Sequence, residues 1–117
     1  MKKIYYLSTC DTCKRILNDI EAPADFELQD IKTDEITKKQ IEEMQALAGS
    51  YESLFSKRAR LYKERDLKNK DLSEEDYKAL ILEHYTFLKR PVIINGKEIF
   101  IGNAKKNVAA AKESIHG

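Results

Sequence analysis

The sequence predicts an α/β fold, in which a mixed four-stranded sheet is flanked by helices and a helical insertion covers about residues 33–88. Three observations lead to this expectation: a strand–helix–strand pattern at the start, helical periodicity through the middle, and two short strands followed by a helix at the end. At 117 residues with 42% apolar residues, the chain is expected to form a single domain over 1–117 with one core.

The first third of the chain has the pattern of a β-α-β unit. Lys3–Ser8 is rich in aromatic and β-branched residues, as a strand would be. Asp11–Ile20 places apolar side chains on one helical face, and Pro23 prevents the helix from continuing. Asp25–Asp30 alternates polar and apolar residues, which predicts a half-buried second strand. Right-handed crossover makes this strand parallel to the first.

The middle of the chain is polar and helical. Thr33–Gly49 carries apolar residues at helical spacing, and Gly49 is expected to end that helix. Tyr51–Tyr62 contains a basic cluster of Lys57, Arg58 and Arg60. Ser73 is followed by three acidic residues, so a helix is expected to begin there and to run to about Leu88.

The last quarter predicts a hairpin and a helix. Arg90–Ile94 is expected to form a short strand opened by Pro91. Asn95-Gly96 is a strong hairpin-turn signal, and Lys97–Ile101 supplies the returning strand. A final helix runs from Asn103 or Ala104 to Ile115, with Val108, Ala109 and Ala111 expected to pack inward. The whole order of elements is that of a thioredoxin-type architecture.

Composition argues against several classes of function. The 21 Lys and Arg residues nearly balance the 20 Asp and Glu residues, so no bulk attraction to nucleic acid or to a membrane surface is expected. No stretch is apolar over the length of a membrane span, and no secretion signal is recognised. Together with a close cysteine pair, this indicates a protein of the reducing cytoplasm.

Cys10-Asp11-Thr12-Cys13 is the feature that points to chemistry. It contains both cysteines of the chain and lies between a predicted strand and a predicted helix. The first sulfur is therefore expected at the helix N-terminus, where free N–H groups and the helix dipole favour an anion. A lowered thiol pKa produces thiolate, the reactive species, so the motif indicates redox or nucleophilic chemistry.

The cysteine pair has two alternative interpretations. A structural zinc site needs four ligands, and the remaining candidates, His84 and His116, do not form a paired motif, so no metal is expected. The second interpretation is a pair of buried structural thiols. Asp11 and Thr12 favour a solvent-facing helix start, which makes redox or nucleophilic chemistry the preferred interpretation.

With these residues in view, the chain resembles the arsenate reductase (ArsC)/Spx family, a branch of the thioredoxin-like fold with a helical insertion. The resemblance covers nearly the whole chain and depends on three segments in combination. These are 6–15 with the cysteine pair, 54–64 with Leu54-Phe55-Ser56-Lys57-Arg58, and 89–103 with Lys89-Arg90-Pro91, Gly96-Lys97 and Ile101-Gly102-Asn103.

The resemblance implies that Cys10 is the nucleophile, since it stands where the family has its catalytic cysteine. Cys13 is a departure from the glutathione-coupled arsenate reductases, which carry only the first cysteine, whereas Spx-type regulators carry both as a redox switch. Having both permits an internal Cys10–Cys13 disulfide, which resolves a mixed disulfide without an outside thiol.

The resemblance also implies three arginines that clamp an oxyanion, a task suited to the guanidinium group. Arg90 matches the second, and Pro91 beside it is expected to follow a cis peptide bond and to face Cys10. The position of the first clamp arginine lies near Ser56, where Arg58 or Arg60 is close enough in the sequence to substitute for it. The position of the third is Asn103, where the chain has no arginine. Arg90 paired with a helix acid, and a basic cluster that is simply solvated, are the structural alternatives.

The expected function is that of a cytoplasmic thiol-dependent oxidoreductase, with Cys10 as nucleophile and Cys13 as resolving thiol. Its substrate would be arsenate, another small oxyanion or a mixed disulfide. No cofactor is expected, and glutathione, glutaredoxin or thioredoxin would supply electrons. The alternative is a redox-sensing regulator of the Spx type, which binds the α subunit of RNA polymerase and does not contact nucleic acid directly.

Overall fold

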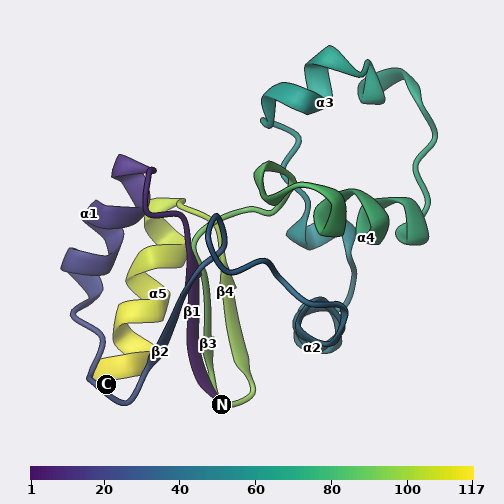
Figure 1. Ribbon diagram of the computed structural model, residues 1–117. Helices are drawn as coiled ribbons and strands as arrows, with labels where there is room; N and C mark the ends of the chain where they lie inside the picture. The colour runs from purple at the N-terminus through teal and green to yellow at the C-terminus, as the bar shows by residue number, and fades with distance from the viewer. The chain divides into compact units, whose positions relative to one another are not determined.

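The computed structural model describes all residues, 1–117, and divides into two compact units. The first unit contains residues 1–35 and 90–117, and the second contains residues 36–89 (Figure 1). Each unit is described by itself below. None of the helices combines the length and the apolar content needed to cross a membrane.

The first unit is built on the predicted four-stranded mixed sheet. Its strands are β1 (Lys2–Tyr6), β2 (Glu27–Asp30), β3 (Val92–Asn95) and β4 (Glu98–Ile101), in the order β2-β1-β3-β4. β1 pairs with β2 in parallel, whereas β3 is antiparallel to both β1 and β4. The β-α-β unit and the hairpin expected from the sequence are therefore both present.

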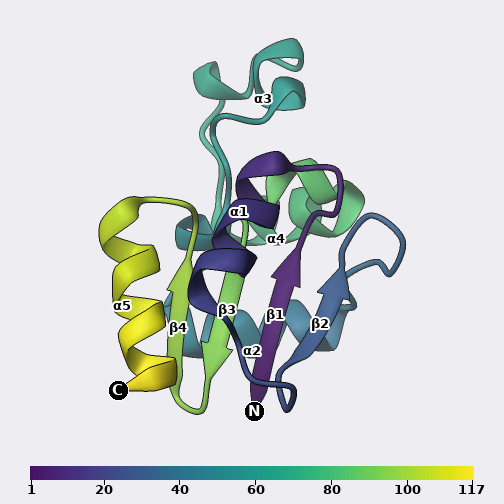
Figure 2. The ribbon, with the colours of Figure 1, turned by 90° about the vertical axis from the view of Figure 1, so that its left-hand side faces the viewer.

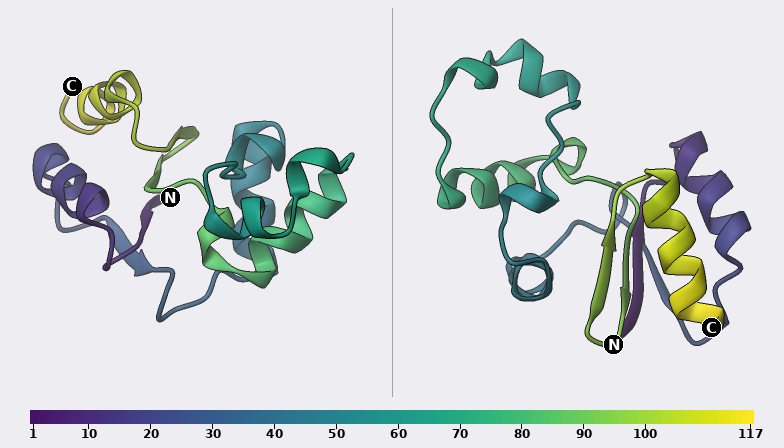
Figure 3. Two further views of the ribbon diagram at one scale, coloured as in Figure 1. Left: turned by 90° about the horizontal axis from the view of Figure 1, so that it is seen from above. Right: turned by 180° about the vertical axis from the view of Figure 1, so that it is seen from behind.

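Two helices, α1 (Asp11–Ile20) and α5 (Lys105–His116), cover one face of this sheet (Figures 2 and 3). The core between the helices and the sheet contains Ile4, Ile16, Ile20, Phe26, Ile93, Val108 and Ala111. Ala109, which was expected to pack inward, is exposed. It follows Val108 by one residue, which turns its side chain about 100° away from the buried stripe of α5.

The last turn of α5 contacts two other parts of this unit. Nε2 of His116 donates to the carbonyl oxygen of Ile20 at 2.6 Å, at the end of α1. The Ser114 hydroxyl accepts from the Asn95 side chain at 3.0 Å and donates to Glu98 at 2.7 Å. Both ends of the β3–β4 turn and the end of α1 are thereby connected to α5.

The hairpin turn lies one residue later than the sequence predicted. Asn95 pairs with Glu98, so the two loop residues are Gly96 and Lys97 and not Asn95 and Gly96. Gly96 has a φ of +65°, and it is the only one of the two with a positive φ. A glycine with positive φ at the first loop position is the pattern of a type II′ turn, which fits the twist of a hairpin.

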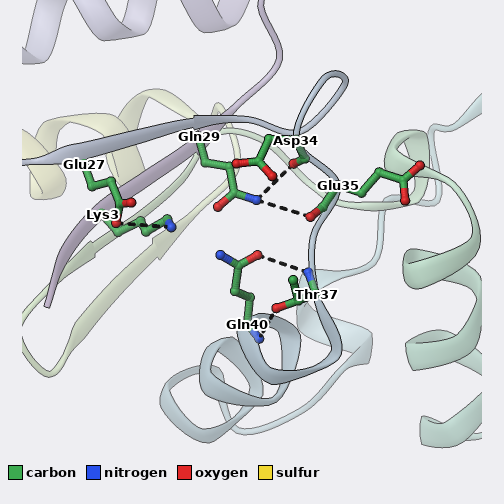
Figure 4. A network of polar contacts seen from close by, with 7 residues as sticks. All are labelled: Lys3, Glu27, Gln29, Asp34, Glu35, Thr37 and Gln40. Carbon is green, nitrogen blue, oxygen red and sulfur yellow. Dashed lines mark hydrogen bonds and ion pairs between the residues drawn. The ribbon is translucent and has the colours of Figure 1, made fainter.

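Burial along β2 departs from simple alternation of polar and apolar residues. Phe26 is buried, but Leu28, two residues later, is 54% exposed, and Gln29 is buried at 3%. Leu28 lies on the edge strand, whereas the Gln29 side-chain amide donates to the carbonyl oxygens of Asp34 at 3.0 Å and Glu35 at 3.5 Å (Figure 4). Hydrogen bonding thus allows a polar residue to be buried where the pattern predicted an exposed one.

The second unit is helical and contains α2 (Lys38–Ala48), α3 (Arg60–Glu64) and α4 (Glu74–Glu83). Three short 3₁₀ turns cover Glu52–Leu54, Leu67–Asn69 and Tyr85–Phe87. Phe55 lies at the centre of an aromatic cluster, with its ring 5.8, 4.9 and 5.3 Å from the rings of Tyr62, Tyr77 and Phe87. A single β-bridge joins Phe55 to Leu88.

Both predicted helices of this unit differ from the structure at one end. The helix expected from Thr33 begins at Lys38, because Thr37 and Gln40 form a capping box there (Figure 4). The helix expected to reach Leu88 ends at Glu83, because His84 is extended and its Nδ1 accepts the N–H of Thr86. Ser73 and Gly49 cap their helices as predicted.

Candidate active site

Cys10 stands between the loop that follows β1 and the first turn of α1. Its N–H donates to the Leu7 carbonyl at 3.0 Å, and its carbonyl accepts from Lys14 N at 3.1 Å, which begins the helix. Its backbone is extended, with φ −97° and ψ 112°, as an N-cap residue requires. The structure thus confirms the expected position of the first cysteine at the start of the helix.

Cys13 lies one turn further along, on the inner face of α1 with Ile16 and Ile20. It is fully buried, whereas Cys10 is half-buried, and both are free thiols. Burial raises the pKa of Cys13 to about 11, because a thiolate there would be desolvated, and a charged Cys10 beside it acts in the same direction. Cys13 therefore stays protonated at neutral pH.

Cys10 has the opposite tendency. Its partial burial by itself raises the pKa, but several contacts outweigh that effect and hold the pKa below that of an ordinary cysteine. These contacts are hydrogen bonds from the backbone and thiol of Cys13, the positive charge of Arg90, and a hydrogen bond from the backbone of Thr12. The arrangement therefore favours a nucleophilic thiolate at Cys10 and a thiol at Cys13.

Arg90 and Pro91 precede β3 in the same unit. The peptide bond between them is cis, as the family resemblance implied. Pro91 is buried, and its carbonyl accepts the N–H of Gly102 at 2.9 Å. The half-buried Arg90 lies close enough to both cysteines for its charge to lower the pKa of each. The first unit thus brings together Cys10, Cys13 and Arg90.

Arg58 and Arg60, the other predicted binding residues, belong to the second unit, and both are exposed. Arg60 begins α3, and its Nε lies 3.3 Å from Glu64 Oε1, one helical turn later. Neighbouring Lys57 pairs with Glu52 at 3.2 Å. A role of Arg58 or Arg60 in holding an oxyanion stays a prediction. Asn103, at the place of the third clamp, is exposed beside the start of α5.

The sequence did not single out Asp30, the last residue of β2. Its Oδ1 accepts the N–H of Ser8 at 3.2 Å and the N–H of Lys32 at 3.2 Å. Hydrogen bonds from the Ser8 side chain, the largest effect, and from backbone N–H groups hold the pKa of Asp30 below its usual value. Its place at the end of a predicted strand parallel to the first could have pointed to Asp30, because the carboxyl ends of two parallel strands meet at the same edge of a sheet.

Comparisons with known proteins agree with this fold. The model of the ArsC family matches residues 5–111. An arsenate reductase from Vibrio cholerae is similar in structure, with 18% identity, coverage of 94% of this chain and 96% of that one, and a TM-score of 0.77. A protein from Staphylococcus aureus COL is 27% identical, with a TM-score of 0.72, and the match covers 95% of this chain and 98% of that one.

An arsenate reductase (ArsC) related protein from Brucella melitensis gives a TM-score of 0.69 at 19% identity, with coverage of 93% and 92%. No curated protein matches the sequence. The structural neighbours share the thioredoxin-like fold, and the family model spans most of the chain, including the cysteine pair and Arg90-Pro91. The chain therefore belongs to the ArsC family.

Proposed function

We propose that this protein is a thiol-dependent oxidoreductase of the cytoplasm, in which Cys10 attacks the substrate and Cys13 resolves the resulting adduct. The observation that carries the proposal is the contrast between the two thiols. Contacts at Cys10 favour its thiolate, whereas burial holds Cys13 as a thiol. A pair of merely structural thiols would not require one member to be stabilised as an anion.

With a mixed disulfide as substrate, the Cys10 thiolate attacks one sulfur, forms a Cys10–sulfur bond and expels the other sulfur as a thiolate. Cys13 then gives up its proton and attacks the Cys10 sulfur. This forms the Cys10–Cys13 disulfide and releases the second substrate thiol. The substrate gains two electrons and the cysteine pair loses two. Glutathione, glutaredoxin or thioredoxin would return the pair to its reduced state.

With arsenate, the Cys10 thiolate would displace one oxygen as water and form a sulfur–arsenic bond. Attack of Cys13 on Cys10 then leaves the electron pair on arsenic, which becomes arsenite. Arg90 would bind the oxyanion, because the guanidinium presents paired donors to it. Arg58 and Arg60 are the further candidates for this task.

The first step changes the surroundings of the second thiol. A charged Cys10 raises the pKa of Cys13, whereas Arg90 lowers it. Once the Cys10 sulfur is bound to substrate, its negative charge is gone while the charge of Arg90 remains. Cys13 therefore loses its proton more readily after the adduct has formed than before, which orders the two steps.

A side-by-side assay tests the proposal. Arsenate and a glutathione mixed disulfide are offered as substrates, each with glutathione and glutaredoxin or with thioredoxin as electron donor. We expect turnover with at least one combination. Cys10→Ser should abolish it, and Cys13→Ser should accumulate a covalent adduct visible by mass spectrometry. Thr12→Ser, a change between the two cysteines that leaves both thiols, is the control. Absence of turnover in every combination would contradict the proposal.

Cys13 also favours a second function, that of a redox-sensing regulator of the Spx type. Both cysteines are present as such a switch requires, and the place of the third clamp arginine holds Asn103. A pull-down with the C-terminal domain of the RNA polymerase α subunit separates the functions. Binding that depends on the oxidation state of the pair, without steady-state turnover, would favour the regulator. Turnover without binding would favour the reductase.

A further inference from the structure

The loop that carries Cys10 is held from the neighbouring strand by one side chain. β1 ends at Tyr6, which is in register with Asp30, and the N–H of Ile31 donates to the Tyr6 carbonyl at 2.9 Å. Beyond this point the backbone of β1 turns toward α1. The Asp30 carboxylate continues the pairing through its side chain, because Oδ1 accepts the N–H of Ser8.

The contact at Ser8 is two residues from the nucleophile. The carbonyl of Leu7, which precedes Ser8, accepts the N–H of Cys10 at 3.0 Å. A backbone group of Leu7 also acts on the Cys13 thiol and lowers its pKa. A shift of Ser8 would therefore move the turn that places the Cys10 sulfur at the start of α1.

The same carboxylate is itself well fixed. Oδ1 accepts the N–H of Lys32, two residues later, and the Ser8 hydroxyl donates to the carboxylate as well. Asp30 thus joins the carboxyl ends of β1 and β2 at the edge of the sheet that carries Cys10.

We propose that Asp30 is a positioning residue for Cys10, which fixes the Ser8–Cys10 loop and so keeps the sulfur at the N-terminus of α1. This inference deepens the proposed function and depends on Cys10 being the reactive thiol. Asp30 does not touch the substrate in this role. It acts through the geometry of the loop, so its acceptor atom matters more than its charge.

Three substitutions separate geometry from charge. Asp30→Asn keeps an oxygen that accepts the two N–H groups but removes the charge. Asp30→Glu keeps the charge but displaces the oxygen by one methylene group, and Asp30→Ala removes both. Asp25→Ala is the matched control, since Asp25 is an exposed carboxylate of the same unit that pairs with Lys2 at 2.8 Å.

The measurement is the pH dependence of iodoacetamide alkylation at Cys10, read by mass spectrometry in the Cys13→Ser background. It requires no substrate and no turnover, so it stands even if the reductase assay fails. We expect Asp30→Ala and Asp30→Glu to raise the pKa of Cys10 by about half a unit, which lowers the thiolate fraction roughly threefold at neutral pH. Asp30→Asn and Asp25→Ala should retain the unsubstituted rate within about a factor of 1.5.

Two outcomes would overturn the proposal. If Asp30→Asn slows alkylation as much as Asp30→Ala, an acceptor oxygen at position 30 is not sufficient to hold the loop, because loss of the negative charge by itself would favour the Cys10 thiolate. If neither Asp30→Ala nor Asp30→Glu changes the rate, the loop does not depend on Asp30. Circular dichroism confirms that each variant is folded. Should Asp30→Ala be unfolded, the comparison of Asp30→Glu with Asp30→Asn decides alone.

Discussion

Alkylation of the two cysteines measures the contrast on which the proposed chemistry depends. The pKa of Cys13 is about 11 and that of Cys10 lies below the ordinary 9.0, so the two differ by more than about two units. At neutral pH, two units make the thiolate fraction of Cys10 roughly 100-fold larger. The more basic thiolate is intrinsically the better nucleophile. At a Brønsted coefficient of ~0.5, the thiolate of Cys13 would react about tenfold faster than the thiolate of Cys10.

The net expectation is that Cys10 alkylates at least about tenfold faster than Cys13 at neutral pH. Burial of Cys13 increases this ratio further, since the reagent cannot reach a fully covered sulfur. The assay is limited iodoacetamide labelling, followed by peptide mass spectrometry over a pH series, with Cys10→Ser and Cys13→Ser to assign each rate. Equal rates for the two thiols across the neutral range would refute the reasoning.

Three other predictions follow from the same structure. Arg90→Ala should raise the pKa of Cys10, measured by ultraviolet thiolate absorbance against pH. Arg90→Lys should keep most of the lowering of that pKa but should bind anions more weakly. An unchanged pKa in Arg90→Ala would contradict the placement of Arg90. The folded state holds the Cys13 proton more tightly than the unfolded state does, because the pKa of Cys13 is raised from 9.0 to about 11 on folding. The free energy of unfolding should therefore be highest below pH 9.0 and should fall by up to about 2 kcal/mol as the pH rises toward 11. Denaturant titrations over a pH series measure this fall. That fall should be smaller in Cys13→Ala, and an identical pH slope in both proteins would count against it. Thr37→Ala should cost about 1 kcal/mol by loss of the capping box, whereas Thr33→Ala should cost less than about 0.5 kcal/mol; the reverse order would show that the helix begins at Thr33.

Local signals were sufficient for most of the fold. The buried face of α1 and its start at Cys10 follow from spacing and from the strand before it, and the parallel pairing of β1 and β2 follows from crossover handedness. The start of α2 was missed although Thr37 and Gln40 carry the capping-box signal, because apolar periodicity was extended back to Thr33. The end of α4 depends on a hydrogen bond from Thr86 to His84, which periodicity does not reveal.

The site was only partly predictable for a different reason. The cysteines and Arg90-Pro91 are marked by residue type and spacing, and the family resemblance placed them correctly relative to the strands. Gln29 and Asp30 owe their surroundings to hydrogen bonds with backbone groups two to 22 residues away. The contact of Asp30 with Ser8 exists only once β1 and β2 are paired, and alternation alone places a polar residue such as Gln29 in solvent.

The bond from His116 to Ile20 joins residues 96 positions apart and ties the far end of the helix that begins at Cys10. α1 has no basic residue in its own last turn, and His116 of α5 supplies a hydrogen-bond donor to a carbonyl oxygen at its C-terminus. Changes at the last turn of α5, such as a fused affinity tag or proteolytic trimming after Ile115, would therefore act on the helix that holds both thiols. Preparations used for thiol chemistry on this protein are best tagged before Met1.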